Sequence, residues 1–139
     1  MQQITDSLMV TAERQGLQEI TGDVLGWLGR QGITDGLLTL FIRHTSASLL
    51  IQENAAPAAR RDVERWFARL APEGGSYEHD EEGPDDMPAH LRSAITQTHL
   101  AIPVNGGKLM LGTWQGIYLF EHRRRPSPRE IALHLLGTA

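Results

Sequence analysis

The residues best suited to metal or acid–base chemistry are concentrated between Tyr77 and His90. This segment holds two histidines and six carboxylates, namely His79, His90, Glu78, Asp80, Glu81, Glu82, Asp85 and Asp86. Without those carboxylates the net charge of the chain would change from -4 to +2. Close carboxylates repel one another and disfavour the ionised form. A bound cation, a basic partner or solvent must therefore relieve the repulsion in this segment.

A third histidine, His44, follows a predicted buried strand, and we expect it to share a divalent metal, zinc or magnesium, with His79 and His90. Imidazole nitrogens with a carboxylate or water suit zinc, and an open position would let the ion polarise a substrate oxygen or activate water. The chain has no cysteine, so the ligands must be nitrogen or oxygen atoms. The spacing matches no standard zinc motif, and solvated histidines are the alternative.

Asp85 and Asp86 precede a predicted helix whose first turn holds Pro88 and which also carries His90. A carboxylate at a helix start accepts free amide hydrogens and complements the helix dipole, which is worth about 1 kcal/mol. One carboxylate suffices for that. The other could orient a histidine, fix its tautomer or bind magnesium, or it could simply be solvated.

The spacing of apolar residues predicts helices over residues 21–30 and 57–70, besides the one that begins near Asp86. A two-stranded hairpin is expected within residues 3–20, turning at Gly16. Further strands are expected at residues 37–42, 48–52, 100–104, 108–120 and 131–136, with a turn at Asn105-Gly106-Gly107. Thr113-Trp114-Gln115-Gly116 would then interrupt a strand, which indicates either a bulge or the close approach of a ligand.

This order of elements predicts an α+β fold, a compact single domain over residues 1–139. We expect mainly antiparallel sheets in a sandwich-like arrangement with two or three inserted helices. No glycine-rich phosphate loop follows the first strand. No apolar run is long enough to span a bilayer and no signal peptide is visible, so a cytoplasmic protein without a membrane partner is expected.

The arginines are gathered near the end of the chain, although the net charge is negative. The mild acidity argues against nucleic-acid binding. The cluster consists of Arg123, Arg124, Arg125 and Arg129. Their planar donors could bind phosphate, or they could form an exposed face at a subunit edge.

Four segments together resemble the YjbQ family: His44-Thr45-Ser46-Ala47-Ser48-Leu49, Gln52-Glu53-Asn54-Ala55, Asp85-Asp86-Met87-Pro88-Ala89-His90-Leu91 and Leu111-Gly112-Thr113-Trp114-Gln115-Gly116-Ile117. The resemblance covers nearly the whole chain. It implies a compact α+β domain that assembles as a homotrimer, with metal or phosphate-like ions near its histidines. It also implies secondary thiamine-phosphate synthase activity, which joins a pyrimidine diphosphate to a thiazole phosphate and releases pyrophosphate.

The same resemblance implies a shared pocket of His44, Asn54, His79, Asp86, His90, Thr113, Gln115 and Glu121. The catalytic roles are assigned to His44, Asp86, Glu121 and Gln115, and substrate binding to Asn54, Thr113 and Arg123. The metal ligands are His44, His79 and His90. The sequence departs from the family pattern at Ala56, where an acidic residue is common, and in the surroundings of His79.

Three functions follow from these residues. The first is a thiamine-phosphate synthase-like transferase acting on small phosphorylated molecules, whether as its main or as a side activity. The second is a metal-dependent hydrolase or lyase in which Glu121 or Asp86 moves protons. The third is a noncatalytic trimeric protein that binds or senses a metabolite.

Overall fold

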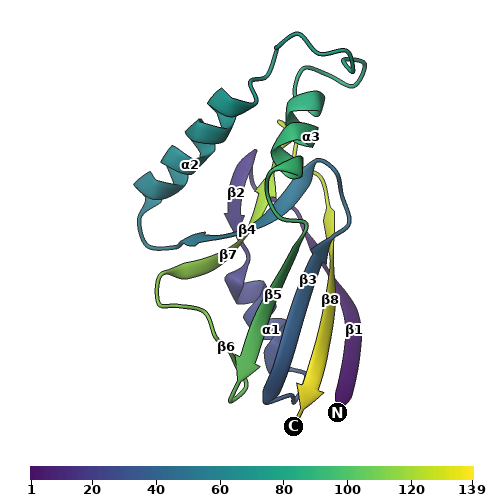
Figure 1. The fold of residues 1–139 in the computed structure, drawn as a ribbon, viewed down its shortest axis with the longest axis vertical. Coiled ribbons are helices and arrows are strands. Elements are labelled where there is room, and N and C mark those ends of the chain that lie inside the picture. Colours follow the sequence, from purple (N-terminus) through teal and green to yellow (C-terminus); the bar gives the residue numbers. More distant parts are fainter.

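The computed structural model describes residues 1–139 as two antiparallel sheets and three helices (Figure 1). The elements in chain order are β1 (Gln2–Val10), β2 (Gly16–Glu19), α1 (Thr21–Gly29), β3 (Asp35–Ile42), β4 (Ala47–Glu53), α2 (Pro57–Leu70), α3 (Asp86–Ala94), β5 (His99–Asn105), β6 (Lys108–Leu109), β7 (Gln115–Glu121) and β8 (Arg129–Thr138). The larger sheet has the strand order β1-β8-β3-β5-β6, and the smaller has β2-β7-β4. The predicted α+β class with antiparallel sheets is confirmed.

The first two strands do not form the expected hairpin. β1 pairs along its whole length with β8, from Gln2 opposite Gly137 to Val10 opposite Arg129, whereas β2 pairs with β7 in the other sheet. The alternation of apolar residues predicts that both segments are extended, but it does not show which strands they pair with. In the observed pairing Val10 lies opposite Arg129 and packs against the main core.

The hairpin at Asn105-Gly106-Gly107 is confirmed, since β5 and β6 pair on either side of it. The single strand expected over residues 108–120 is wrong, because β6 ends at Leu109 and β7 begins at Gln115 in the other sheet. A turn lies between them, closed by the Gln115 amide hydrogen on the Gly112 carbonyl at 3.1 Å. Gly112 and Gly116 therefore lie where the chain crosses from the larger sheet to the smaller one.

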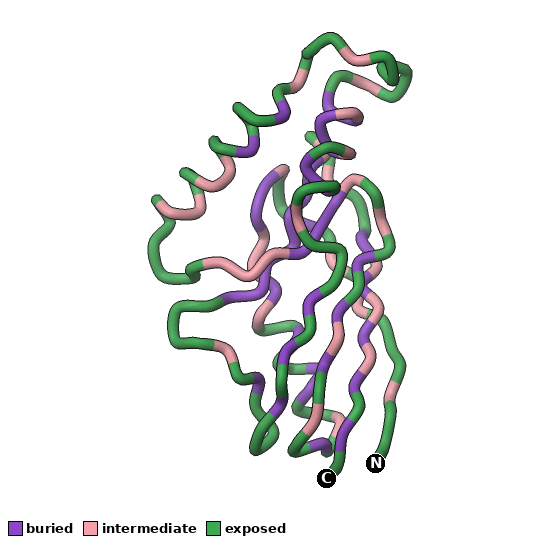
Figure 2. Tube along the Cα trace, in the orientation of Figure 1, coloured by how far each residue is buried: buried purple, intermediate pink, exposed green.

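The two sheets share one core of 20 buried residues, into which α1 also packs. Leu38 on β3 and Leu135 on β8 are cross-strand neighbours and fully buried, and Ile117 on β7 reaches the same core from the smaller sheet. The opposite face of the smaller sheet forms a second cluster of Leu17, Phe67, Tyr118 and Phe120. The burial of Phe67 in this cluster contributes about 1.5–3 kcal/mol to stability and holds α2 against this face. Figure 2 shows the buried stretches meeting where the sheets approach.

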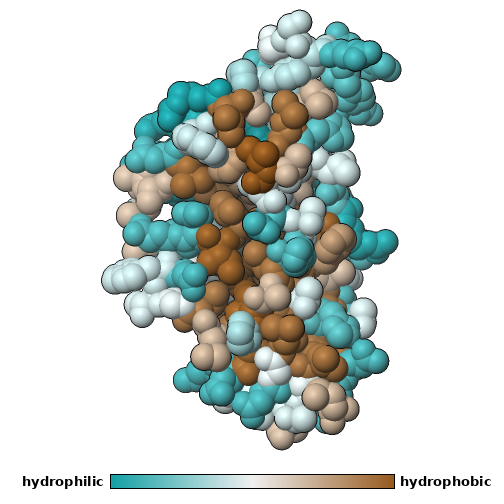
Figure 3. All heavy atoms as spheres, viewed as in Figure 1, coloured by the Kyte–Doolittle hydropathy of each residue, from teal (hydrophilic) through white to brown (hydrophobic).

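The outer face of the larger sheet has no helix against it in the view of Figure 1. Leu37, Phe41 and Leu136 remain 43%, 47% and 41% exposed there. Figure 3 shows hydrophobic spheres gathered along the middle of the same view. No helix of the chain has both the length and the apolar character required to cross a membrane; the longest, α2, has 14 residues.

Candidate functional site

Two of the three predicted histidine ligands meet at the start of α3. Asp86 is the first residue of this helix and His90 lies one turn later, so both project from the same face. The loop after α2 folds back and brings His79 to them. The His79 Nε2 lies 3.0 Å from Asp86 Oδ2, and the His90 Nε2 lies 3.3 Å from the same oxygen. The two ring centroids are 5.6 Å apart.

The donor atoms of His79, Asp86 and His90 all lie within 4.8 Å of one another. Ligands of a tetrahedral zinc ion, bound at about 2.0–2.2 Å, stand roughly 3.3 Å apart. The two nitrogen–oxygen separations suit such an ion, whereas the two imidazole nitrogens are placed only to within 4.8 Å of each other. Two imidazoles and one carboxylate also leave room for water or substrate. The exposed Glu82 places its Oε2 3.5 Å from His79 Nε2, at the edge of the group.

Arg123 fixes the orientation of the Asp86 carboxylate. Its Nη1 donates to Asp86 Oδ1 at 2.8 Å, so Oδ2 is the oxygen left facing the histidines. Burial raises the pKa of Asp86, but the hydrogen bond with His79 and the charges of His90 and Arg123 outweigh it. The pKa therefore lies below its ordinary value, and Asp86 is ionised at neutral pH, as a metal ligand requires.

Asp85 occupies the N-cap position of α3 but makes no capping hydrogen bond through its side chain, contrary to one of our expectations. Its Oδ2 accepts from Arg123 Nε at 3.0 Å and from the Arg124 amide at 2.8 Å. Burial raises the pKa of Asp85, yet these bonds lower it more. Asp85 thus joins α3 to the segment after β7.

Glu121, the last residue of β7, is fully buried against Arg129. Arg129 Nε donates to its Oε1 at 2.9 Å, and the Arg123 amide donates to its Oε2 at 3.1 Å. Arg129 Nη2 also donates to Oε2. Both oxygens are occupied, so this arrangement suits a positioning group better than the proton-moving role that the hydrolase or lyase alternative gives to Glu121.

His44 stands outside the His79–Asp86–His90 group. Its Nε2 accepts the Glu130 amide hydrogen at 2.8 Å, and its Nδ1 lies 3.4 Å from Arg129 Nη1. Burial and the charge of Arg129 lower the pKa of His44, which favours the neutral ring. His44 is nevertheless connected to the His79–Asp86–His90 group through Arg129, Glu121 and Arg123.

Asn54, Thr113 and Gln115 lie at the other end of the smaller sheet. Glu121 pairs with Ala47 at one end of the β4–β7 ladder, and Gln115 pairs with Glu53 at the other. Six residues of strand separate these ends by about 20 Å. The Gln115 side chain accepts the Gly112 amide at 2.8 Å, and Asn54 Nδ2 reaches the Gln115 carbonyl at 3.5 Å. Within one chain these residues do not meet the histidines.

An arginine pocket of about 500 Å³ lies beside the His79–Asp86–His90 group, to which Arg123 connects it. Its lining residues are Ser46, Asp85, Arg123, Arg124, Arg125, Ser127 and Arg129. Three of its four arginines are paired with carboxylates, Arg123 with Asp85 and Asp86, Arg124 with Glu73 and Arg129 with Glu121, and Arg125 alone forms no ion pair. Arg123 belongs both to this pocket and to the Asp86 contact. The sequence cluster of arginines therefore converges in space rather than scattering over the surface.

Sequence reasoning missed the buried pair of Ser48 and His122. Their side chains lie 2.8 Å apart (Oγ to Nε2), and Thr96 donates to Ser48 at 2.6 Å. Burial, with the charges of Arg92 and Arg129, lowers the pKa of His122 to about 3. β7 is buried on both faces from Gly116 to Glu121, so an extension of that buried run by one residue would have included His122, but nothing local indicates Ser48 as its partner.

Comparisons with known proteins find similar sequences that match nearly the whole chain. The family model described as UPF0047 protein YjbQ-like matches residues 6–138. The chain is 47% identical over 131 residues to the UPF0047 protein sll1880 of Synechocystis, covering 94% of this chain and 89% of that protein. It is 44% identical over 132 residues to the UPF0047 protein YjbQ of Escherichia coli O157:H7, covering 94% and 96%.

Solved structures show the same fold. The hypothetical protein APE1520 of Aeropyrum pernix K1 has a TM-score of 0.86 and 34% identity, covering 96% of this chain and 98% of that chain. The YbjQ-like protein SSO2532 of Sulfolobus solfataricus P2 has a TM-score of 0.88 and 28% identity, with 98% of each chain covered. The chain therefore belongs to the YjbQ-like UPF0047 family.

Proposed function

We propose that this protein is a metal-dependent enzyme acting on a small phosphorylated substrate. One observation carries the proposal: Arg123 joins a group of three potential metal ligands to a pocket lined by four arginines. The group with the Asp86 carboxylate could hold a cation, and the adjacent arginines could bind an anionic substrate.

His79, Asp86 and His90 would hold the ion, because their donor atoms lie within 4.8 Å of one another and the Asp86 carboxylate is ionised. A zinc ion supplies Lewis acidity toward a substrate oxygen or an activated water at this position. Asp86 is held in place by Arg123, and His79 is the ligand with the most exposed side chain, at 45%.

The arginine pocket would bind the phosphate groups. Guanidinium donors match phosphate oxygens in pairs and offset charge that develops on a leaving group. Arg125 is exposed and forms no ion pair, so its donors remain free for a ligand, whereas Arg124 also pairs with Glu73. The pocket volume of about 500 Å³ lies within the range of about 300–1,000 Å³ typical of small-molecule sites.

Thiamine-phosphate synthesis is the specific reaction that we propose to test first. It joins a pyrimidine diphosphate to a thiazole phosphate, so both substrates are anions and pyrophosphate leaves. The arginine pocket suits that leaving group, and the His79–Asp86–His90 group lies beside it. A metal-dependent hydrolase remains the second candidate, because the same two histidines and one carboxylate would also leave an ion open to water.

We further propose that the chain assembles as a homotrimer. The exposed apolar side chains of Leu37, Phe41 and Leu136 on the outer face of the larger sheet support burial against another copy. Assembly would also account for Asn54 and Gln115, which lie far from the histidines of their own chain. Light scattering at several concentrations measures the assembly directly, and a monomer throughout would reject it.

The activity test compares the wild type with His90→Ala in steady-state synthesis from the two thiamine precursors. We expect synthesis that is lost on chelation, restored by zinc or magnesium, and absent in His90→Ala. His99→Ala is the matched control, because His99 is exposed on β5 and touches neither site. Equal rates in wild type and His90→Ala would reject the proposal. Release of phosphate from simple esters without thiamine phosphate would favour the hydrolase.

A further inference from the structure

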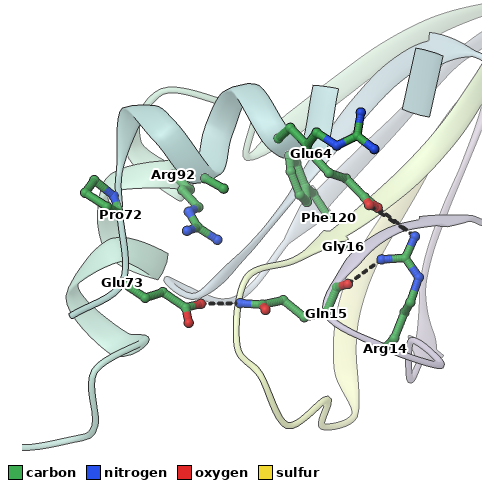
Figure 4. Close-up of a pocket in the computed structure, with 10 residues that line it drawn as sticks. Arg14, Gln15, Gly16, Glu64, Pro72, Glu73, Arg92 and Phe120 are labelled. Carbon is green, nitrogen blue, oxygen red and sulfur yellow. Dashed lines mark hydrogen bonds and ion pairs between the residues drawn. The ribbon is translucent and has the colours of Figure 1, made fainter. Parts of the chain in front are cut away.

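A second pocket, of about 430 Å³, lies between α2, α3 and the start of β2 (Figure 4). None of its lining residues belongs to the arginine pocket. We call it the interhelical pocket, and its walls include Ala68 on α2, Phe120 on β7 and Arg92 on α3. The proposed function makes no use of it.

Arg92 is the unusual residue of this pocket because it is a buried arginine that makes no direct ion pair. It is only 6% exposed, and its Nε and Nη2 both donate to the Ala71 carbonyl, at 3.3 and 2.8 Å. No carboxylate lies within ion-pair distance of it, and its Nη1 makes no hydrogen bond within the chain, although the charge of Glu73 acts on it from farther away. Figure 4 shows the guanidinium pointing into the space between Glu73 and Phe120. A buried charge left unpaired is costly, so a bound anion would stabilise it.

The other charged groups around the pocket are already matched. Glu64 pairs with Arg14 at 2.7 Å. Glu73 pairs with Arg124 and also accepts from Gln15 Nε2 at 2.7 Å. Both glutamates are thus bonded to other groups, and Glu73 acts on Arg92 only from beyond ion-pair distance, which leaves the Nη1 edge of Arg92 without a partner in the chain.

We propose that the interhelical pocket binds a small organic carboxylate, with the carboxylate on Arg92 and the apolar body against Phe120 and Ala68. The lining side chains are three arginines and two glutamates, a net charge of one positive unit, which suits a monoanion. A phosphate dianion fits less well, because Glu64 and Glu73 lie in the same walls. Phe120 and Ala68 supply the apolar surface of a pocket whose other walls are mostly polar and charged, so Arg92 is the group that would select a carboxylate.

Isothermal titration with benzoate tests the site, with benzyl alcohol as the uncharged comparison. We expect saturable binding of benzoate and none of benzyl alcohol. Arg92→Lys keeps a donor for Ala71 but loses the forked geometry, and should bind about tenfold more weakly, equivalent to about 1.4 kcal/mol. Arg69→Gln is the matched control, since Arg69 is exposed on the same helix α2 but does not line the pocket.

Ala68→Phe tests the site without touching Arg92. Ala68 is exposed on α2, so the larger ring should fill the pocket without unfolding the chain and abolish benzoate binding. The proposal is overturned if wild type does not bind benzoate, if Ala68→Phe binds it equally well, or if benzyl alcohol binds as tightly. Because these readouts need neither metal nor thiamine precursors, they are independent of the proposed enzyme activity.

Discussion

Arg123 Nη1 donates to Asp86 Oδ1 at 2.8 Å, so the two oxygens of this carboxylate have different partners. Oδ1 faces the arginine pocket, whereas Oδ2 lies 3.0 and 3.3 Å from the imidazoles of His79 and His90. A substrate phosphate that binds Arg123 would therefore act on the residue that holds the ion. The contact couples the two halves of the proposed site.

Removal of one imidazole should weaken metal binding strongly. Residues that only orient a metal ligand contribute about 10–100-fold to affinity, so loss of a ligand in His90→Ala should exceed about 100-fold. Competition with a fluorescent zinc chelator measures this. His99→Ala should bind zinc like the wild type, and an unchanged affinity in His90→Ala would place the ion elsewhere.

Arg123→Gln should weaken both halves of the site at once. Loss of the guanidinium frees Asp86 to rotate, which we expect to lower zinc affinity by about 10–100-fold, and it removes a phosphate donor. Arg125→Gln is the contrasting variant, because Arg125 lines the arginine pocket without contacting Asp86. It should weaken only phosphate binding. Parallel titrations with zinc and inorganic phosphate would separate the two effects, and identical losses in both variants would contradict the coupling.

His122 should make the protein less stable as the pH falls from 6.5 toward 3. Burial, more than the charges of Arg92 and Arg129, lowers its pKa from 6.5 to about 3. Between these two pKa values, the unfolded chain binds a proton at His122 and the folded chain does not. Stability is fully present above pH 6.5 and falls by about 1.4 kcal/mol for each pH unit within this window.

His122→Phe isolates that contribution, because it retains a ring beside Phe120 and removes the titrating group. Urea unfolding of both proteins at several pH values is the measurement. The wild type should lose stability with acid more steeply than the variant by about 1.4 kcal/mol per pH unit. Parallel curves would show that His122 is protonated in the folded state.

Glu121→Gln should destabilise the fold by about 3 kcal/mol, because Arg129 would keep a buried charge without its counter-ion. Glu130→Gln is the control. Glu130 pairs with Arg43, whose side chain is 60% exposed, and such a pair contributes less than about 1 kcal/mol. Chemical unfolding at neutral pH compares the two. A stable Glu121→Gln protein that is inactive would instead support direct participation of Glu121 in proton transfer.

The sequence predicted the parts of the site that depend on local geometry. Asp86 and His90 are four residues apart at a helix start, so their meeting follows from helix periodicity once Pro88 marks the first turn. The concentration of acidic residues between Tyr77 and His90 also indicated the segment that holds the candidate site, although only Asp85 and Asp86 among these acids are buried.

Long-range partners could not be read from the sequence. His44 was expected beside His90, yet its ring is held by Glu130 and Arg129, because the end of β3 lies against the start of β8. Strand alternation shows which residues are buried but not which strand lies alongside. The same limitation produced the false hairpin at Gly16 and concealed the Glu121–Arg129 pair.

Anomalous diffraction at the zinc edge, from crystals grown with zinc and a phosphate ester, tests the central claim most directly. We expect one ion within about 2.2 Å of His79 Nε2, His90 Nε2 and Asp86 Oδ2, with the phosphate on Arg123. An ion bound elsewhere, or these three side chains without an ion at saturating zinc, would contradict the proposed metal site.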